Sequence, residues 1–218
     1  MEYSFILDNQ LFRGIDKMKA QQFLSEAGCR QVNFSPGQMI YMAGDRINSI
    51  GIVMSGQVMV ESADERGNRV IFSTVEPSGH FGDAYAVTGM PLTNNVMAAE
   101  DSQVMFIKMD KLREGKTGSV ASQIRGNLVE ILAKKNMVLS RKIRVTSRKT
   151  IRQRIMVFLK DESILQGSDQ FQISFDRQSL ADYLNCDRSQ LSKELSRMQE
   201  EGLIQYRKNY FKIFFYLW

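Results

Sequence analysis

The chain has 218 residues, 43% of them hydrophobic, which is enough for one large domain or two small ones with packed cores. No apolar run reaches the roughly 20 residues that a membrane-spanning helix needs, and the start, MEYSFILDNQ, lacks the basic segment of a signal peptide. Two distant cysteines, Cys29 and Cys186, fit a reducing compartment. Together these features predict a cytoplasmic protein that does not associate with membranes.

The positive charge of the chain is concentrated in its last third. Residues 1–140 carry 14 Lys and Arg against 15 Asp and Glu, a net charge of −1, whereas residues 141–218 carry 15 against 9, a net charge of +6. This asymmetry favours a polyanionic partner for the last third, with nucleic acid ahead of a membrane surface. On charge alone, a solvated basic face remains the alternative.

The first half of the chain reads as β-structure that follows a helix over residues 15–27. Short apolar runs recur between Gly, Pro, Asn and Asp turn signals, which is typical of a barrel or sandwich. The expected strands cover residues 39–41, 50–54, 58–60, 70–72, 96–98 and 104–107.

A long helix is expected from residue 120 to about 159, because this stretch has no Pro and a single Gly. Its apolar residues recur at heptad spacing, so the stripe needs a partner, which is the β domain, a second copy of the helix, or both. An interruption near residues 146–147 suggests a hinge between domains. The dimer interface predicted from this stripe consists of Ile124, Leu128, Ile131, Lys135, Val138 and Val145.

Two short helices with a three-residue turn are expected within residues 177–200. Asp176 and Asp187 stand at their N-cap positions, and Asp187 with Gln190 has capping-box spacing. Inward apolar faces are formed by Leu180, Leu184, Leu191, Leu195 and Met198. Such a pair is a helix-turn-helix, whose second helix can enter a DNA major groove.

The start of the second helix is rich in hydrogen-bond donors. Arg188 has the shape to grip guanine O6 and N7, Ser189 or Gln190 would contact a base or a phosphate, and Lys193 a base edge or the backbone. The terminal run LIQYRKNYFKIFF reads as a hairpin that would act as a wing over phosphates. The predicted DNA-binding residues are Arg177, Arg188, Ser189, Gln190, Ser192, Lys193, Arg207 and Lys208.

The chain resembles the cyclic-AMP receptor protein/FNR (Crp/Fnr) family of bacterial transcription regulators over nearly its full length. The motifs that carry the resemblance are SPGQMIYMAGD (35–45), IGIVMSGQVMV (50–60), GHFGD (79–83), the long helix, and RQSLADYLNCDRSQLSKELSRMQEEGLI (177–204). The resemblance implies an α+β fold with a double-stranded β-roll (residues 1–117), a dimerisation helix (118–146) and a winged helix-turn-helix (147–218). It also implies a homodimer on an inverted-repeat operator in double-stranded DNA, with RNA polymerase as a further partner.

One departure from the family concerns the cyclic-nucleotide cassette. Binders carry a Gly-Glu pair for the ribose and an Arg-Ser pair for the cyclic phosphate, where this chain has Gly82-Asp83 and Leu92-Thr93. Leucine cannot offset a phosphate charge, so we expect an effector other than cyclic AMP, or none. The expected effector pocket consists of Asp83, Tyr85, Leu92, Thr93 and Asn94, with Asn136 and Ser140 from the helix.

Other chemistries find little support in the sequence. Two cysteines are too few for an iron–sulfur cluster, and His80 is expected to be a surface turn residue, so no metal or cofactor is predicted. No nucleophile motif or phosphate loop is present, which argues against an enzyme. A regulator without an effector, a thiol switch through Cys29 or Cys186, and a ligand-binding adaptor that does not bind DNA remain alternatives.

Overall fold

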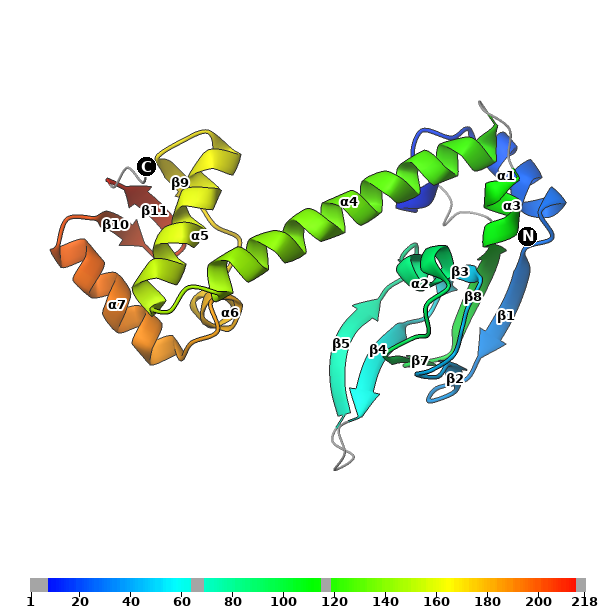
Figure 1. The fold of residues 1–218 in the computed structure, drawn as a ribbon, viewed down its shortest axis with the longest axis horizontal. Coiled ribbons are helices and arrows are strands. Elements are labelled where there is room, and N and C mark those ends of the chain that lie inside the picture. The colour runs from blue at the N-terminus through cyan, green and yellow to red at the C-terminus, as the bar shows by residue number, and fades with distance from the viewer. Residues whose placement is uncertain (1–7, 64–68, 115–118, 215–218) are drawn as a thin grey trace. The chain divides into compact units, whose positions relative to one another are not determined.

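The computed structural model describes residues 8–63, 69–114 and 119–214 (Figure 1). The chain divides into two compact units, Met1–Ala133 and Lys134–Trp218. None of the helices in the described ranges is both long and apolar enough to cross a membrane. The expected α+β fold, with a β-roll, a long helix and a C-terminal winged helix-turn-helix, is confirmed.

The N-terminal unit is built on two four-stranded antiparallel sheets. One has the order β1 (Arg30–Phe34), β8 (Ser102–Lys108), β3 (Ser49–Ser55) and β6 (His80–Phe81). The other has the order β2 (Met39–Tyr41), β7 (Asn95–Ala98), β4 (Val58–Ala63) and β5 (Arg69–Val75). All six expected strands are present, whereas β1 and β6 were not predicted, since their sequences lack a clear apolar run.

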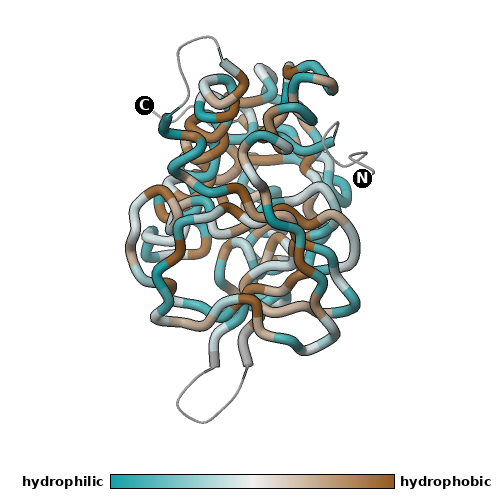
Figure 2. The backbone as a smooth tube through the Cα atoms, turned by 90° about the vertical axis from the view of Figure 1, so that its right-hand side faces the viewer, coloured by the Kyte–Doolittle hydropathy of each residue, from teal (hydrophilic) through white to brown (hydrophobic). Residues whose placement is uncertain are grey.

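The two sheets enclose an inner core because alternate side chains of each strand point to the same face. Figure 2 shows hydrophobic and hydrophilic residues interspersed along the backbone. The buried core residues are Val53, Val58, Phe81, Val96 and Val104. Packing is close at Gly51, where an added Cβ would lie 2.3 Å from Phe81 Cζ, so the Phe81 ring occupies the space of a side chain.

A second core forms where helices cover Met105 and Ile107 of β8. The covering elements are a 3₁₀ turn (Gln10–Phe12), α1 (Lys17–Glu26), α2 (Asp83–Thr88), α3 (Met109–Arg113) and the first half of α4 (Val120–Thr146). Asn127 of α4 donates hydrogen bonds of 2.9 Å to the carbonyl oxygens of Leu11 and Arg13, which fixes the helix against this segment.

The packing of α4 corrects the predicted dimer interface. Ile124, Leu128 and Ile131 are 0–7% exposed within the N-terminal unit, and Val145 is fully buried in the core of the C-terminal unit. These four side chains are covered by their own chain, so the prediction is wrong for them. The most apolar heptad stripe of α4 packs into the cores of its own chain and is not available to a second copy. Lys135 and Val138 are exposed, and their role at an interface stays a prediction.

The C-terminal unit packs helices on a three-stranded sheet of order β10-β11-β9. Its elements are α5 (Ile151–Gln166), β9 (Gln170–Gln172), α6 (Arg177–Tyr183), α7 (Arg188–Glu200), β10 (Ile204–Arg207) and β11 (Tyr210–Ile213). The helix predicted to reach residue 159 is broken after Thr146 and restarts at Ile151, with Thr150 and Gln153 forming a capping box. The two units nevertheless divide inside α4, between Ala133 and Lys134, because the last turn of α4 belongs to the C-terminal core.

Candidate functional site

The helix-turn-helix consists of α6 and α7. Leu191, Leu195 and Met198 are fully buried and fix one face of α7 against the core. The opposite face therefore points outward at the start of the helix, where Arg188, Ser189, Gln190 and Lys193 are exposed and Ser192 is half-buried. The expected inward and outward faces are both present, and the donors cluster in the first two turns.

The turn between the helices depends on Asn185, which has a φ of +52°. Asn tolerates this left-handed conformation better than most residues, which explains the sharp change of direction. The turn is also held from behind, since Arg154 of α5 donates to the carbonyl oxygens of Leu184 (3.0 Å) and Asn185 (2.8 Å). Lys142 of α4 bonds the carbonyl oxygen of Tyr183. Sequence reasoning missed Arg154 and Lys142, because nothing local marks them.

The two predicted N-caps differ in the structure. Asp176 accepts a 2.7 Å hydrogen bond from the Ser179 amide, and this bond lowers the pKa of its carboxyl group, with a smaller effect from the Arg188 charge. Asp187 occupies the N-cap position of α7 but makes no side-chain cap bond. The predicted capping box with Gln190 is therefore wrong, and the first turn of α7 begins without a carboxylate bonded to its amides.

The predicted wing is the β10–β11 hairpin, in which Lys208 has a φ of +55° at the tip. Arg207 and Lys208 are exposed there. Arg177, predicted to contact DNA, is half-buried. Its Nη2 donates to the Lys208 carbonyl oxygen at 3.2 Å, and its guanidinium lies 5.1 Å from the centre of the Tyr206 ring. Arg177 thus ties α6 to the wing.

Between α6, the start of α7 and the wing lies an open groove of about 650 Å³. Arg177, Arg188, Lys208, Asn209 and Ser192 contribute donors to its lining, and Asp176 is its acidic residue. A groove with cations on both walls suits a phosphate backbone. Four of the eight predicted DNA-binding residues line this groove directly, namely Arg177, Arg188, Ser192 and Lys208. The other four are not part of its lining.

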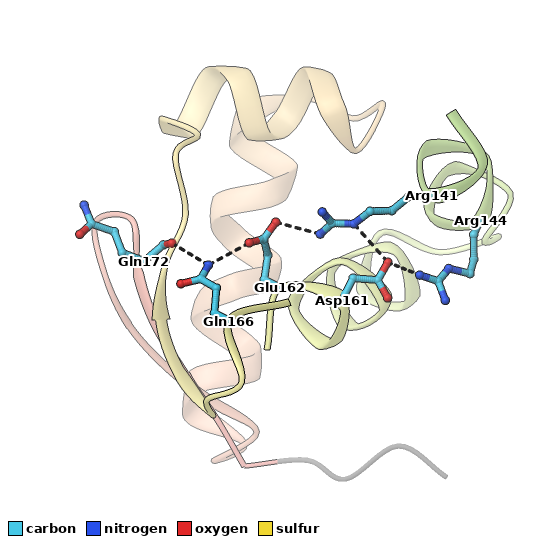
Figure 3. A network of polar contacts seen from close by, with 6 residues as sticks. All are labelled: Arg141, Arg144, Asp161, Glu162, Gln166 and Gln172. Carbon is cyan, nitrogen blue, oxygen red and sulfur yellow. Dashed lines mark hydrogen bonds and ion pairs between the residues drawn. The ribbon is translucent and has the colours of Figure 1, made fainter. Parts of the chain in front are cut away.

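Figure 3 shows a polar network that joins the end of α4 to α5 and β9. Asp161, 6% exposed, lies 2.6 Å from Arg144 Nη2 and 3.3 Å from Arg141 Nε. Arg141 Nη2 also bonds Glu162 at 2.8 Å. Gln166 continues the network, donating to Glu162 Oε2 and to the carbonyl oxygen of Gln172 at 3.0 Å each. The end of α4 is therefore held firmly on the helix-turn-helix unit.

In the cassette region of the β-roll, one predicted residue is buried and others contact one another. Leu92 is 5% exposed and packs in the second core, and the Tyr85 hydroxyl lies 2.6 Å from Thr93 Oγ1. Asp83 is buried beside His80, whose Nε2 lies 3.2 Å from Asp83 Oδ2 without hydrogen-bond geometry. His80 is in β6 and 9% exposed by its side chain, so its prediction as a surface turn residue is wrong.

The predicted effector pocket draws its residues from both compact units. Asp83, Tyr85, Leu92, Thr93 and Asn94 lie near one another around α2 and the start of β7. Asn136 and Ser140 belong to the other compact unit, where Ser140 Oγ donates to Asn136 Oδ1 at 3.1 Å on the exposed face of α4. Their part in a pocket stays a prediction.

A second heptad stripe on α4 is exposed. Val129 and Ile143 are 67% and 66% exposed, and Asn136 lies midway between them at seven-residue spacing. Three small exposed residues, also seven apart, each precede one member of this stripe by three positions: Gly126, Ala133 and Ser140. An added Cβ at Gly126 would meet nothing within 4 Å in the described part of the chain, so this glycine is not required by internal packing.

Both cysteines are half-buried and free. Burial raises the pKa of Cys29 to about 11, and burial also raises the pKa of Cys186. The thiolate is the reactive form, so neither environment favours a thiol switch at neutral pH.

Comparison with known proteins agrees with this architecture. Residues 31–115 match the model of the cyclic nucleotide-binding domain, and residues 153–214 match that of the Crp-like helix-turn-helix domain. The transcriptional activator protein FnrA of Stutzerimonas stutzeri is 26% identical over 175 residues, covering 78% of this chain and 70% of that protein. The anaerobic regulatory protein of Haemophilus influenzae is 26% identical over 192 residues, covering 84% and 72%.

Among solved structures, the Thermus thermophilus catabolite activator protein has a similar fold, with a TM-score of 0.52 at 18% identity over 94% of each chain. The N-terminal domain of a Streptomyces coelicolor transcriptional regulator has a TM-score of 0.53 at 19% identity, covering 62% of this chain and 94% of that one. The two matching domains in family order, the curated relatives and the exposed recognition helix lead to one conclusion. The chain belongs to the Crp/Fnr family and is a DNA-binding transcription regulator with a cyclic-nucleotide-binding-type domain.

Proposed function

We propose that the chain acts as a homodimer that reads an inverted-repeat operator through the first two turns of α7. The observation that carries this proposal is the placement of Arg188 and Ser192 in the groove shared with the wing, with Ser189, Gln190 and Lys193 exposed beside it. Arg188 would read a guanine, and Lys208 and Arg207 would contact phosphates. Arg177 would support the wing instead of reading a base.

The homodimer would form through the exposed stripe of α4, with Val129, Asn136 and Ile143 facing the same residues of a second copy. Small residues at Gly126, Ala133 and Ser140 would let two helices approach closely. A glycine inside a helix costs about 1 kcal/mol relative to alanine, so an unfilled Cβ position there is accounted for by a close partner. Two recognition helices one DNA turn apart would read half-sites roughly 10–11 base pairs apart.

The effector would be a molecule other than cyclic AMP. Leu92 is buried in the core where cyclic-nucleotide binders carry an arginine, so this position supplies no charge to a cyclic phosphate, and Asp83 lies beside His80. RNA polymerase is the expected protein partner, because the relative FnrA is named a transcriptional activator protein. A regulator that binds chromosomal DNA in a bacterium works in the cytoplasm.

The test is selection of bound sequences from a random DNA pool at near-physiological salt, using the wild type, Arg188→Ala and Arg197→Ala. Arg197 is an exposed cation at the other end of the same helix, so it controls for the lost charge. We expect an inverted repeat with the wild type and Arg197→Ala, and loss of the base preference with Arg188→Ala, worth about 1–3 kcal/mol of discrimination. An unchanged repeat with Arg188→Ala would refute the assignment of α7.

A further inference from the structure

A hollow of about 310 Å³ opens into the β-roll between its two sheets. It lies at the side where β1 and β2 are the edge strands of their sheets, and it is also lined by the start of β3 and the end of β8. Its volume falls at the lower end of the range for small-molecule sites, about 300–1,000 Å³. No residue of the cassette, 82–94, lines it.

The inner walls of the hollow are aromatic and apolar. Phe34, Ile40, Tyr41 and Phe106 line it and pack on the inner core. The Phe106 ring centroid lies 6.3 Å from that of Phe34 and 5.9 Å from that of Tyr41, both in edge-to-face arrangements. Aromatic walls of this kind favour a flat apolar guest, because its ring can add further edge or face contacts.

The rim of the hollow is cationic. Arg30 pairs with Phe106 across the β1–β8 ladder, and Lys108 lies two residues after Phe106, so both cations are on the inner face with Phe106. Both are exposed, and in the described part of the chain neither has a carboxylate within ion-pair distance. The two cations on the inner face are therefore available to bind an anionic group above the apolar floor.

A neutral hydroxyl completes the polar part of the lining. Burial raises the pKa of Tyr41 to about 12, with opposing effects from Arg30, which lowers it, and Asp45, which raises it. The Tyr41 hydroxyl therefore keeps its proton at neutral pH and can donate a hydrogen bond to an anion. Ser49, opposite Lys108 in the β3–β8 ladder, also lines the hollow, and its hydroxyl donates to Asn48 Oδ1 at 3.1 Å.

We propose that this hollow is a binding site for a small arylalkanoic acid, whose ring enters between Phe34, Tyr41 and Phe106 and whose carboxylate is held by Arg30 and Lys108. An anion without an apolar body would leave the aromatic floor uncovered. A neutral aromatic would leave the two cations without a counter-ion. The site is independent of how the recognition helix reads DNA, so it stands or falls separately from the proposed operator.

The test uses the full chain and 3-phenylpropionate as the probe, with 3-phenylpropionamide as a neutral match of the same shape. Binding is measured by calorimetry and located by backbone amide NMR. We expect the acid to bind at least about tenfold more tightly than the amide, since a charge-assisted hydrogen bond contributes roughly one factor of ten or more. The shifted amides should include Gly28, Arg30, Ser49 and Lys108.

Variants then assign the charge contacts. Arg30→Gln and Lys108→Gln should each weaken binding of the acid about tenfold and leave the amide unaffected, whereas Lys111→Gln, which removes an exposed cation outside the hollow, should change neither. Both replaced side chains are exposed, so the fold should persist. Equal affinity for acid and amide, no binding of the acid at millimolar concentration, or shifts confined to Tyr85 and Thr93 would each overturn the proposal.

Discussion

Arg177, in the first turn of α6, donates a hydrogen bond of 3.2 Å to the carbonyl oxygen of Lys208 at the tip of the wing. The same guanidinium lies over the Tyr206 ring, and burial together with the Arg188 charge lowers the pKa of Arg177. Because the guanidinium donates a hydrogen bond within the protein, fewer of its N–H groups are available to contact DNA. The wing is therefore linked to α6 by a contact that lines the groove beside the recognition helix α7.

Replacement of Arg177 by Gln should weaken binding to all DNA sequences alike. The wing loses its tie to α6, and with it the placement of Lys208 on phosphates, so we expect an affinity about three- to tenfold lower for operator and random DNA. Fluorescence anisotropy with both DNAs measures this. A changed base preference at one operator position would instead mean that Arg177 itself contacts a base.

Two neighbouring residues of α4 should respond in opposite ways to the same substitution. Val129→Asp places a charge on the exposed stripe and should give a folded monomer, measured by light scattering. Leu128→Asp buries an unpaired carboxylate in the core of the β-roll unit, where Leu128 is 4% exposed, and should lower the free energy of unfolding by about 3 kcal/mol or more. A Val129→Asp variant that stays dimeric would place the interface elsewhere.

An arginine at position 92, where cyclic-nucleotide binders of the family carry one, should destabilise this protein. Leu92 is packed in the core, so Leu92→Arg should cost about 3–5 kcal/mol in urea unfolding. Thr93→Arg, at the exposed neighbouring position, is the control and should cost about 0.5 kcal/mol or less. Equal effects of the two variants would show that position 92 has room for a charged side chain.

The Arg141–Asp161–Arg144 contact should contribute to the stability of the C-terminal unit. Asp161→Asn removes the shared charge and should lower the free energy of unfolding by roughly 1–3 kcal/mol, less than for a fully buried pair because both arginines are partly exposed. Asp169→Asn, an exposed carboxylate on the same unit, should have little effect. No difference between the two variants would mean that the network is solvated.

Cys29 should react slowly. Its pKa of about 11, raised by burial, leaves little thiolate at pH 8, so iodoacetamide should modify it about tenfold or more slowly than free cysteine, even though a more basic thiolate is more nucleophilic. Because folding favours the protonated thiol, its contribution to stability is complete below pH 9 and is lost as the pH rises towards 11. Mass spectrometry of the Cys186→Ser variant follows the reaction, and rapid labelling would contradict the buried placement.

The local features of the fold could be predicted well from sequence. Turn signals around short apolar runs predicted six strands of the roll, and α7 begins and ends at the expected Arg188 and Glu200. Prediction was less accurate where one sequence pattern is compatible with several packing arrangements. Both stripes of α4 have heptad spacing, and only the tertiary structure shows that Leu128 faces inward and Val129 outward.

Site residues were predictable where their role follows from position on one helix. Arg188 and Lys193 are exposed as expected, because burial of Leu191 and Leu195 fixes the face of α7. Arg154 and the Arg30–Lys108 rim were not predictable, since each depends on strands or helices far apart in the sequence. His80 was misjudged for the same reason, because its burial comes from the pairing of β6 with β3.

The adjacent placement of Leu128 and Val129 has an evolutionary consequence. Substitutions at Ile124, Leu128 and Ile131 change the packing of α4 in the core of the β-roll unit. Substitutions at Val129, Asn136 and Ile143 change an exposed surface of the same helix. The two sets share no position, so selection can act on one with little change in the other. A lineage with this helix could therefore acquire a new ligand chemistry in its sensor while keeping its old choice of subunit partner.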